Sequence, residues 1–313
     1  MLWGQSTRGA WDLLGMDAVA VALRTHWFSQ SLWLSNIDSV LDVGSGPGVI
    51  ARLLKAPPSP ASAIEPSRWI CLDQAHISSD SVEDLPGLQM IGGQRFEDAA
   101  PPEAGVGALI SNFGLEYMEP GRWVPATACW LRNGARLHAL VHASGSVIDL
   151  GTEQWMADLS LALDELDFFT LLARLLEAKA TAPADVMARM MHGLEVRDEY
   201  NRAVNRMKAR IEDRGVRGGP ILDILLLARD MVQAVPGLLL EDAHARTRRS
   251  EKSFRAELSR LQAMRKAAWD EQAASSVVAL MELRGFQDIR VSEMSSGSVR
   301  VAWVLEATTS SRS

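Results

Sequence analysis

The sequence predicts an α/β fold in which a mostly parallel sheet is flanked by helices. Short apolar runs alternate with loop and helix segments between residues 38 and 142, a pattern typical of such sheets. Two further runs near the C-terminus are separated by a short glycine-containing turn, which indicates an antiparallel hairpin. Between these regions, residues 151–275 carry apolar side chains at helical spacing. We therefore expect a large all-helical insertion after the fifth strand.

The first four expected strands are continuous apolar runs, as strands buried on both faces require. The five parallel strands are expected at 39–44, 62–66, 88–92, 106–111 and 135–143, and the hairpin at 286–294 and 298–307. Ahead of the sheet, residues 8–34 carry tryptophans and aliphatic side chains at helical spacing, which we expect to pack on the sheet. The predicted domains are N-terminal helices at 1–37, an α/β domain at 38–150 and 276–308, and a helical insert at 151–275.

Composition narrows the classes of partner. The chain of 313 residues is 47% hydrophobic and carries a net charge of −7, so a nucleic-acid backbone or an anionic membrane is not its expected main partner. The two cysteines, Cys71 and Cys129, lie in no paired spacing, which argues against a disulfide framework or a metal site. The sequence has neither an export signal pattern nor a run of 18 apolar residues. We expect a cytoplasmic protein that binds small molecules or proteins.

The segment LDVGSGPGVIARLL, residues 41–54, places three glycines between an expected strand and an expected helix. Such a loop lets a ligand approach the backbone at a helix N-terminus. A phosphate-binding P-loop would continue with Lys and Ser or Thr after its last glycine, but Val49 and Ile50 follow Gly48. A dinucleotide loop needs its third glycine at the position that Val49 occupies. The spacing therefore excludes both of these nucleotide sites.

An acidic residue followed by alternate glycines resembles the first motif of class I S-adenosylmethionine-dependent methyltransferases. Its residues here are Asp42, Gly44, Ser45, Gly46 and Gly48. The resemblance implies S-adenosylmethionine as cofactor and a Rossmann-like seven-stranded sheet with strand order 3-2-1-4-5-7-6. The cofactor carries no phosphate, and its methionine end has an ammonium, which a carboxylate at Asp42 suits, and a carboxylate, which backbone donors suit.

The same resemblance assigns further cofactor-binding residues. Glu65, followed by Pro66, ends the second expected strand and resembles the acidic residue that accepts hydrogen bonds from the ribose hydroxyls. Phe96 and Glu97 follow the third strand, where the family contacts adenine, with Asp98 as an alternative to Glu97. Asn112 and Phe113 end the fourth strand, beside the methyl donor.

Candidates for acid–base chemistry also follow from the expected sheet, because open α/β sheets bind ligands at the carboxyl ends of their strands. Tyr117 and His142 are the predicted catalytic residues. Glu116 is a further candidate, because it follows the fourth strand together with Tyr117, whereas His142 ends the fifth. His138 falls inside the fifth strand and is expected to pack against the sheet. The stretch SNFG after the fourth strand is not the Asn/Asp-Pro-Pro-aromatic motif of enzymes that methylate base amino groups.

The expected function is methyl transfer to a small-molecule acceptor, by O- or C-methylation. In this interpretation the helical insert is a lid or an acceptor-binding subdomain, or else an oligomerisation surface of a homodimer. One segment, residues 246–266, has eight Arg and Lys against two Glu. An RNA or nucleic-acid methyltransferase that uses this basic helix is therefore an alternative, and a non-catalytic adenosylmethionine-binding scaffold protein is another.

Overall fold

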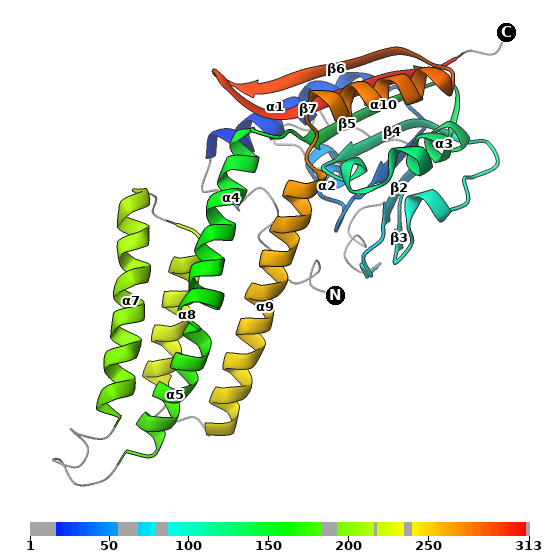
Figure 1. The fold of residues 1–313 in the computed structure, drawn as a ribbon. Coiled ribbons are helices and arrows are strands. Elements are labelled where there is room, and N and C mark those ends of the chain that lie inside the picture. The colour runs from blue at the N-terminus through cyan, green and yellow to red at the C-terminus, as the bar shows by residue number, and fades with distance from the viewer. Residues whose placement is uncertain are drawn as a thin grey trace. The chain divides into compact units, whose positions relative to one another are not determined.

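The computed structural model describes residues 17–55, 68–78, 87–182, 193–215, 218–234 and 240–310. The described chain divides into two compact units (Figure 1). The first, which we call the α/β unit, contains residues up to Leu150 and from Met264 onward. The second, the helical unit, is Gly151–Ala263. Each unit is described below by itself.

The described strands of the α/β unit form one sheet with the order β3-β2-β1-β4-β5-β7-β6, which confirms the predicted order. Their bounds are Ser39–Val43 (β1), Arg68–Asp73 (β2), Leu88–Gly92 (β3), Val106–Asn112 (β4), Leu131–His142 (β5), Phe286–Ser296 (β6) and Val299–Thr309 (β7). The strands β1 to β5 are parallel, and β7 runs antiparallel to both β5 and β6. The carboxyl ends of the parallel strands therefore meet at one edge of the sheet, where ligands bind in such folds.

The second strand differs from its expected position. The expected segment, 62–66, lies outside the described residues, and the strand that pairs with β1 is Arg68–Asp73. Its residues Trp69 to Leu72 are fully covered, so the run WICL is the one that the interior of the sheet requires. The fifth strand also begins earlier than expected, at Leu131, because a shift in register after Val106 lets the segment pair before Ala135.

Helices cover both faces of this sheet (Figure 1). Helices α1 (Asp17–Leu34) and α2 (Val49–Lys55) lie together on one face, and α3 (Pro120–Trp130) and α10 (Glu271–Leu283) lie together on the other. Two short 3-10 turns, η3 (Phe96–Asp98) and η4 (Leu115–Tyr117), follow β3 and β4. Buried residues of α10 recur at helical spacing, and Asp270 caps its first turn by accepting a hydrogen bond from the Ala273 backbone. The core is the apolar layer between sheet and helices.

All elements described in the helical unit are helices. They are α4 (Val147–Ser160), the π-helical turn η5 (Leu161–Glu165), α5 (Phe168–Ala180), α7 (Leu194–Arg214), α8 (Pro220–Ala234) and α9 (Leu240–Ala267), of which α4 begins and α9 ends in the α/β unit. Buried Asp158 of α4 accepts hydrogen bonds from Arg210 and Arg214 of α7, which ties these helices together. A lid, acceptor-binding or oligomerisation role for this unit stays a prediction. None of the helices in the described part of the chain is long and apolar enough to cross a membrane.

Candidate functional site

The glycine loop lies between β1 and α2, at the carboxyl edge of the sheet. Gly44, Gly46 and Gly48 all have positive φ angles, of 68°, 53° and 76°, which favour glycine. A methyl group added at Gly44 would lie 2.8 Å from the Cα atom of Gly114, in the loop after β4. The absence of a side chain at Gly44 therefore lets the loops that follow β1 and β4 touch.

The backbone N–H groups of this loop are already used inside the protein. Those of Gly44 and Ser45 donate to the Leu72 carbonyl, at 2.9 and 3.3 Å. The Gly46 N–H donates to Asp73 Oδ2 at 2.8 Å, and the Gly48 N–H donates to the Ser45 carbonyl at 3.0 Å. The remaining loop residue is Pro47, which has no N–H. The sequence predicted that backbone donors would bind the cofactor carboxylate, but residues 44–48 hold no N–H group that is free to do so.

Asp42 is the least satisfied polar group of the site. Its side chain is 1% exposed, and neither carboxylate oxygen has a hydrogen-bond partner among the described residues. Burial raises the pKa of the Asp42 carboxyl well above its usual range, and the negative charge of Asp73 raises this pKa further. A buried acidic group without a partner is costly. A cationic ligand would supply the missing partner, so the electrostatics of this site favour a positively charged group.

Asp73, which the sequence analysis missed, occupies the carboxyl end of the strand next to β1. Its carboxylate accepts the backbone N–H groups of Gly46 and Ala75, both at 2.8 Å. Burial raises the pKa of Asp73, although these two hydrogen bonds lower it in part. The predicted ribose-binding residues Glu65 and Pro66 lie outside the described residues. The apolar run WICL directly before Asp73 is the sequence signal that could have located it.

The turn η3 holds the residues predicted to contact adenine. Phe96 is 2% exposed and packs in the core, with its ring 6.1 Å from that of Trp130. Glu97 accepts a hydrogen bond from Arg95 at 2.7 Å, and Asp98 accepts one from Arg122 at 2.6 Å. Burial raises the pKa of Glu97, but the Arg95 guanidinium and other nearby donors leave it below its usual range. Phe96 therefore has a core role in this structure, whereas the Glu97 side chain is covered and paired with Arg95.

At the carboxyl end of β4, Asn112 is held by the N-terminal helix α1. The indole nitrogen of Trp27 donates to Asn112 Oδ1 at 2.8 Å. Trp27 itself is fully buried, as expected for a tryptophan that packs on the sheet. No described residue accepts a hydrogen bond from the Asn112 amide nitrogen. The interaction therefore joins α1 to a predicted cofactor-binding residue.

The structure brings the predicted catalytic residues together around His142, at the carboxyl end of β5. The Nδ1 atom of His142 lies 2.5 Å from Glu116 Oε1, which also accepts the His142 backbone N–H at 3.1 Å. The Phe113 ring stacks on the imidazole at 4.2 Å, and the Tyr117 ring meets it edge to face at 6.2 Å. Because carboxylate oxygens only accept, Nδ1 carries the proton and Nε2 is the basic nitrogen of the neutral ring.

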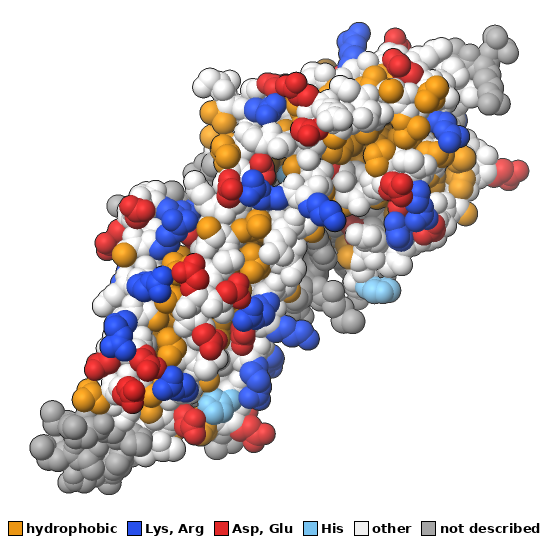
Figure 2. Space-filling model, viewed as in Figure 1, with side chains coloured by type: hydrophobic (Ala, Val, Ile, Leu, Met, Phe, Trp, Pro, Cys, Tyr) orange, Lys and Arg blue, Asp and Glu red, His pale blue; other side chains and the backbone are white. Residues whose placement is uncertain are grey.

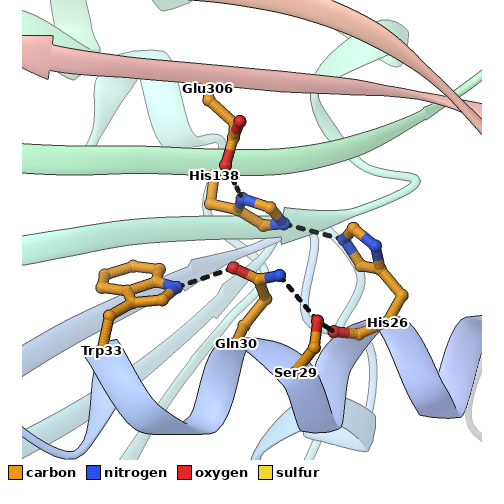
Figure 3. Close-up of polar contacts among 6 residues, drawn as sticks. All are labelled: His26, Ser29, Gln30, Trp33, His138 and Glu306. Carbon is orange, nitrogen blue, oxygen red and sulfur yellow. Dashed lines mark hydrogen bonds and ion pairs between the residues drawn. The ribbon is translucent and has the colours of Figure 1, made fainter.

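His138, which was expected to pack against the sheet, joins a second polar cluster instead of the site around His142. Its Nδ1 atom lies 3.2 Å from Glu306 Oε1 of β7, and its Nε2 atom lies 2.9 Å from Nε2 of His26 on α1 (Figure 3). If His138 Nδ1 donates to the carboxylate, neutral His138 must accept at Nε2, so the His26 ring donates. Burial, followed by the positive charge that His138 carries when protonated, lowers the pKa of His26 to about 4.

Two other kinds of site would be a metal centre and a basic surface for nucleic acid. No group of three or more His, Cys, Asp and Glu side chains among them is arranged to hold a metal ion. Basic side chains gather along α9 in the helical unit (Figure 2). Arg255, Arg260 and Arg265 are in ion pairs. In contrast, four exposed cations have no ion-pair partner in the described part of the chain: Arg246, Arg248, Arg249 and Lys252.

No family model matches the sequence, and no curated protein matches it. Solved structures do match. The apo form of the S-adenosylmethionine-dependent methyltransferase SibL is 12% identical, with 95% of this chain and 57% of that chain covered and a TM-score of 0.44. Human N-acetylserotonin methyltransferase in complex with SAM is 11% identical, with coverages of 94% and 56% and a TM-score of 0.39. A Listeria monocytogenes protein described as an S-adenosylmethionine dependent methyltransferase is 10% identical, with coverages of 92% and 99% and a TM-score of 0.41.

The chain thus spans little more than half the length of the first two of these structures. Its fold is nevertheless defined by its own sheet, whose strand order 3-2-1-4-5-7-6 is that of class I methyltransferases. The order of the strands brings β1 and β4 together in the middle of the sheet, so the glycine loop, Asn112 and the His142 cluster lie at one edge.

Proposed function

We propose that the protein transfers a methyl group from S-adenosylmethionine to a small-molecule acceptor, by O- or C-methylation. The observation that carries this proposal is the buried, unpartnered carboxylate of Asp42 beside a glycine loop at the carboxyl edge of a methyltransferase-type sheet. A structural aspartate would be paired or hydrogen-bonded. An aspartate that binds the ammonium group of a ligand would lack such a partner until the ligand is bound.

The residues at this edge fit the chemistry of the cofactor. Asp42 suits the ammonium of its methionine moiety, and Asp73 is an acidic candidate for the ribose hydroxyls at the end of β2, a role that the sequence analysis gave to Glu65. When bound, S-adenosylmethionine supplies a methyl group on a positively charged sulfonium. Methyl transfer then requires mainly that a nucleophile is aligned and water is excluded.

His142 is the proposed general base for a hydroxyl or activated carbon acceptor. Glu116, whose side chain is fully covered, fixes the imidazole through Nδ1 and leaves Nε2 to accept a proton. Phe113 and Tyr117 restrict the ring from two sides. In this proposal Glu116 positions the imidazole of His142, and the Tyr117 ring packs against that imidazole.

Calorimetry with S-adenosylmethionine and S-adenosylhomocysteine tests the cofactor. We expect binding by the wild-type chain and a loss of at least about tenfold in Asp42→Asn, because a hydrogen bond to a charged group contributes about 1.5 to 3 kcal/mol. Asp38→Asn is the matched control, since Asp38 precedes β1 at its other end and pairs with exposed Arg132 at 2.7 Å. Equal affinities of the two variants would overturn the role of Asp42.

Transfer is tested with S-adenosylmethionine labelled in its methyl group and a panel of phenols, carboxylic acids, amines and carbon acids. We expect His142→Gln to bind the cofactor and to lose about 100-fold or more in transfer to the best acceptor. Glu116→Gln should retain part of the rate, because its amide oxygen still accepts from Nδ1. A chain that binds cofactor but methylates none of these acceptors would favour the scaffold alternative.

A further inference from the structure

Two observations leave the carboxylate of the cofactor without a donor in the glycine loop, residues 44–48. The N–H groups of the glycine loop are consumed within the protein, as described above. The two acidic side chains next to the loop, Asp42 and Asp73, carry oxygen atoms that suit the ammonium and offer the carboxylate no N–H donor. Its hydrogen-bond donor must therefore come from outside residues 44–48.

The Asn112 amide is in the right place to be this donor. Asn112 stands two residues after Ile110, whose register partner in β1 is Asp42, so it lies at the strand end beside the glycine loop. The segment after Asn112 touches the glycine loop, because a methyl group at Gly114 would lie 3.0 Å from the Cα atom of Gly44. The amide nitrogen of Asn112 has no acceptor among the described residues and is not one of the buried unpaired atoms, so it is open to a ligand.

The hydrogen bond from Trp27 fixes the orientation of the Asn112 amide, and therefore which of its atoms faces the ligand. An indole N–H can only donate, so the Asn112 atom 2.8 Å from it must be the carbonyl oxygen. The NH2 group is then directed away from α1. Trp27 cannot easily turn, since it is fully buried and its ring meets that of His138 edge to face at 5.5 Å.

We propose that Trp27 is a positioning residue that locks the Asn112 side chain as a hydrogen-bond donor, and that this donor binds the carboxylate of the cofactor's methionine moiety. The inference rests on the proposed function. It gives α1 a part in cofactor affinity, although α1 supplies no residue of the glycine loop or of the strand ends. No covalent step is involved.

The decisive variant is Asn112→Asp, which still accepts from Trp27 but presents an oxygen where the NH2 group was. We expect its affinity for S-adenosylhomocysteine to fall more than that of Asn112→Ala, for which about a tenfold loss is expected. Affinity for 5′-methylthioadenosine, which lacks both the carboxylate and the ammonium, should be unchanged in both variants. An Asn112→Asp variant that binds S-adenosylhomocysteine as well as the wild type would overturn the donor role.

The role of Trp27 is tested by Trp27→Phe, which removes the N–H group and keeps an aromatic ring. We expect a several-fold loss for S-adenosylhomocysteine, and no additional loss when Asn112→Ala is combined with it, because Trp27 acts through Asn112. The matched control is Trp33→Phe on the same helix, whose indole donates to Gln30 at 2.8 Å (Figure 3). Additive losses, or an equal loss in Trp33→Phe, would indicate a general packing effect and overturn the positioning role.

These outcomes separate the inference from the function on which it rests. A wild-type chain that binds neither S-adenosylmethionine nor S-adenosylhomocysteine overturns both. A wild-type chain that binds them, with an unchanged affinity in Asn112→Asp, overturns the inference alone. If Trp27→Phe does not fold, Asn112→Asp still decides the matter, because Asn112 is partly exposed at a strand end.

Discussion

Gly44 and Gly114 are in backbone contact across the carboxyl ends of β1 and β4. A methyl group built on Gly44 would lie 2.8 Å from Gly114 Cα, and one built on Gly114 would lie 2.7 Å from the carbonyl oxygen of Val43. Real side chains do not approach backbone atoms so closely. The contact therefore needs glycine on both loops, and it joins the loop directly after Asp42 to the segment that carries Phe113, Glu116 and Tyr117.

We expect Gly44→Ala to destabilise the protein much more than Gly46→Ala. Both glycines have positive φ, which costs another residue about 1 to 2 kcal/mol, but Gly46 has no atom within 4 Å of an added methyl group. Overpacking at Gly44 adds about 1 to 3 kcal/mol. Urea unfolding should thus give a loss of about 2 to 5 kcal/mol for Gly44→Ala and about 1 to 2 kcal/mol for Gly46→Ala. Equal losses would mean that the Gly114 contact can relax.

The sequence predicted the strands of the sheet more accurately than the residues of the candidate site. Continuous apolar runs predicted β1, β3 and β4 within one or two residues and the hairpin within two residues. In β1 and β4 these runs reflect burial on both faces. The strand β3 lies at the edge of the sheet, and none of its residues is buried. The second strand was placed too early, on the run 62–66 that contains Glu65, whereas the strand that pairs with β1 is the run WICL before Asp73.

The rest of the site depends on contacts between segments far apart in the sequence. The hydrogen bond of Trp27 with Asn112 spans 85 positions, and neither residue type signals the other. The pairing of His142 with Glu116 was open to prediction, because both follow strand ends that meet at one edge of the sheet. The sequence could not predict that every N–H group of residues 44–48 donates within the protein, because these hydrogen bonds depend on the detailed path of the turn.

We expect Asp42→Asn to raise the thermal stability of the cofactor-free protein while it lowers cofactor affinity. Burial places the folded-state pKa of Asp42 above its unfolded value, so the favourable contribution of the protonated form is complete at low pH and is lost as pH rises through the folded-state pKa. The amide does not titrate. The difference in Tm between Asp42→Asn and wild type should therefore grow as pH rises above about 4.

Saturating S-adenosylhomocysteine provides the second arm of that experiment. It should raise the Tm of the wild type at pH 8 by more than that of Asp42→Asn, since stabilisation by a ligand follows its affinity. A wild-type chain that is more stable than Asp42→Asn without cofactor at every pH would show that Asp42 has a partner in the folded protein, contrary to the absence of one among the described residues.

The pair of His26 and His138 predicts a loss of stability in acid. The pKa of His26 is lowered from 6.5 to about 4, so the unfolded chain binds a proton that the folded chain excludes between these values. The stabilisation is complete above about pH 6.5 and is lost as pH falls toward 4, by at most about 3 kcal/mol. His26→Gln should flatten the dependence of Tm on pH in this interval, and exposed His76→Gln should leave it unchanged. Parallel curves for wild type and His26→Gln would contradict the exclusion of the proton.

The unpaired cations of α9 allow the nucleic-acid alternative to be tested directly. Arg246, Arg248, Arg249 and Lys252 would neutralise at most about four phosphates, so binding of single-stranded RNA should weaken with salt with a logarithmic slope no steeper than about −3. Because the chain as a whole is acidic, we expect labelled RNA to bind no tighter than about 10⁻⁵ M at physiological salt. R248E/R249E should leave methyl transfer to a small-molecule acceptor unchanged, as should R202E/K208E on α7, a matched reversal of two exposed cations. Nanomolar RNA binding that is lost in R248E/R249E and kept in R202E/K208E would instead make RNA the acceptor.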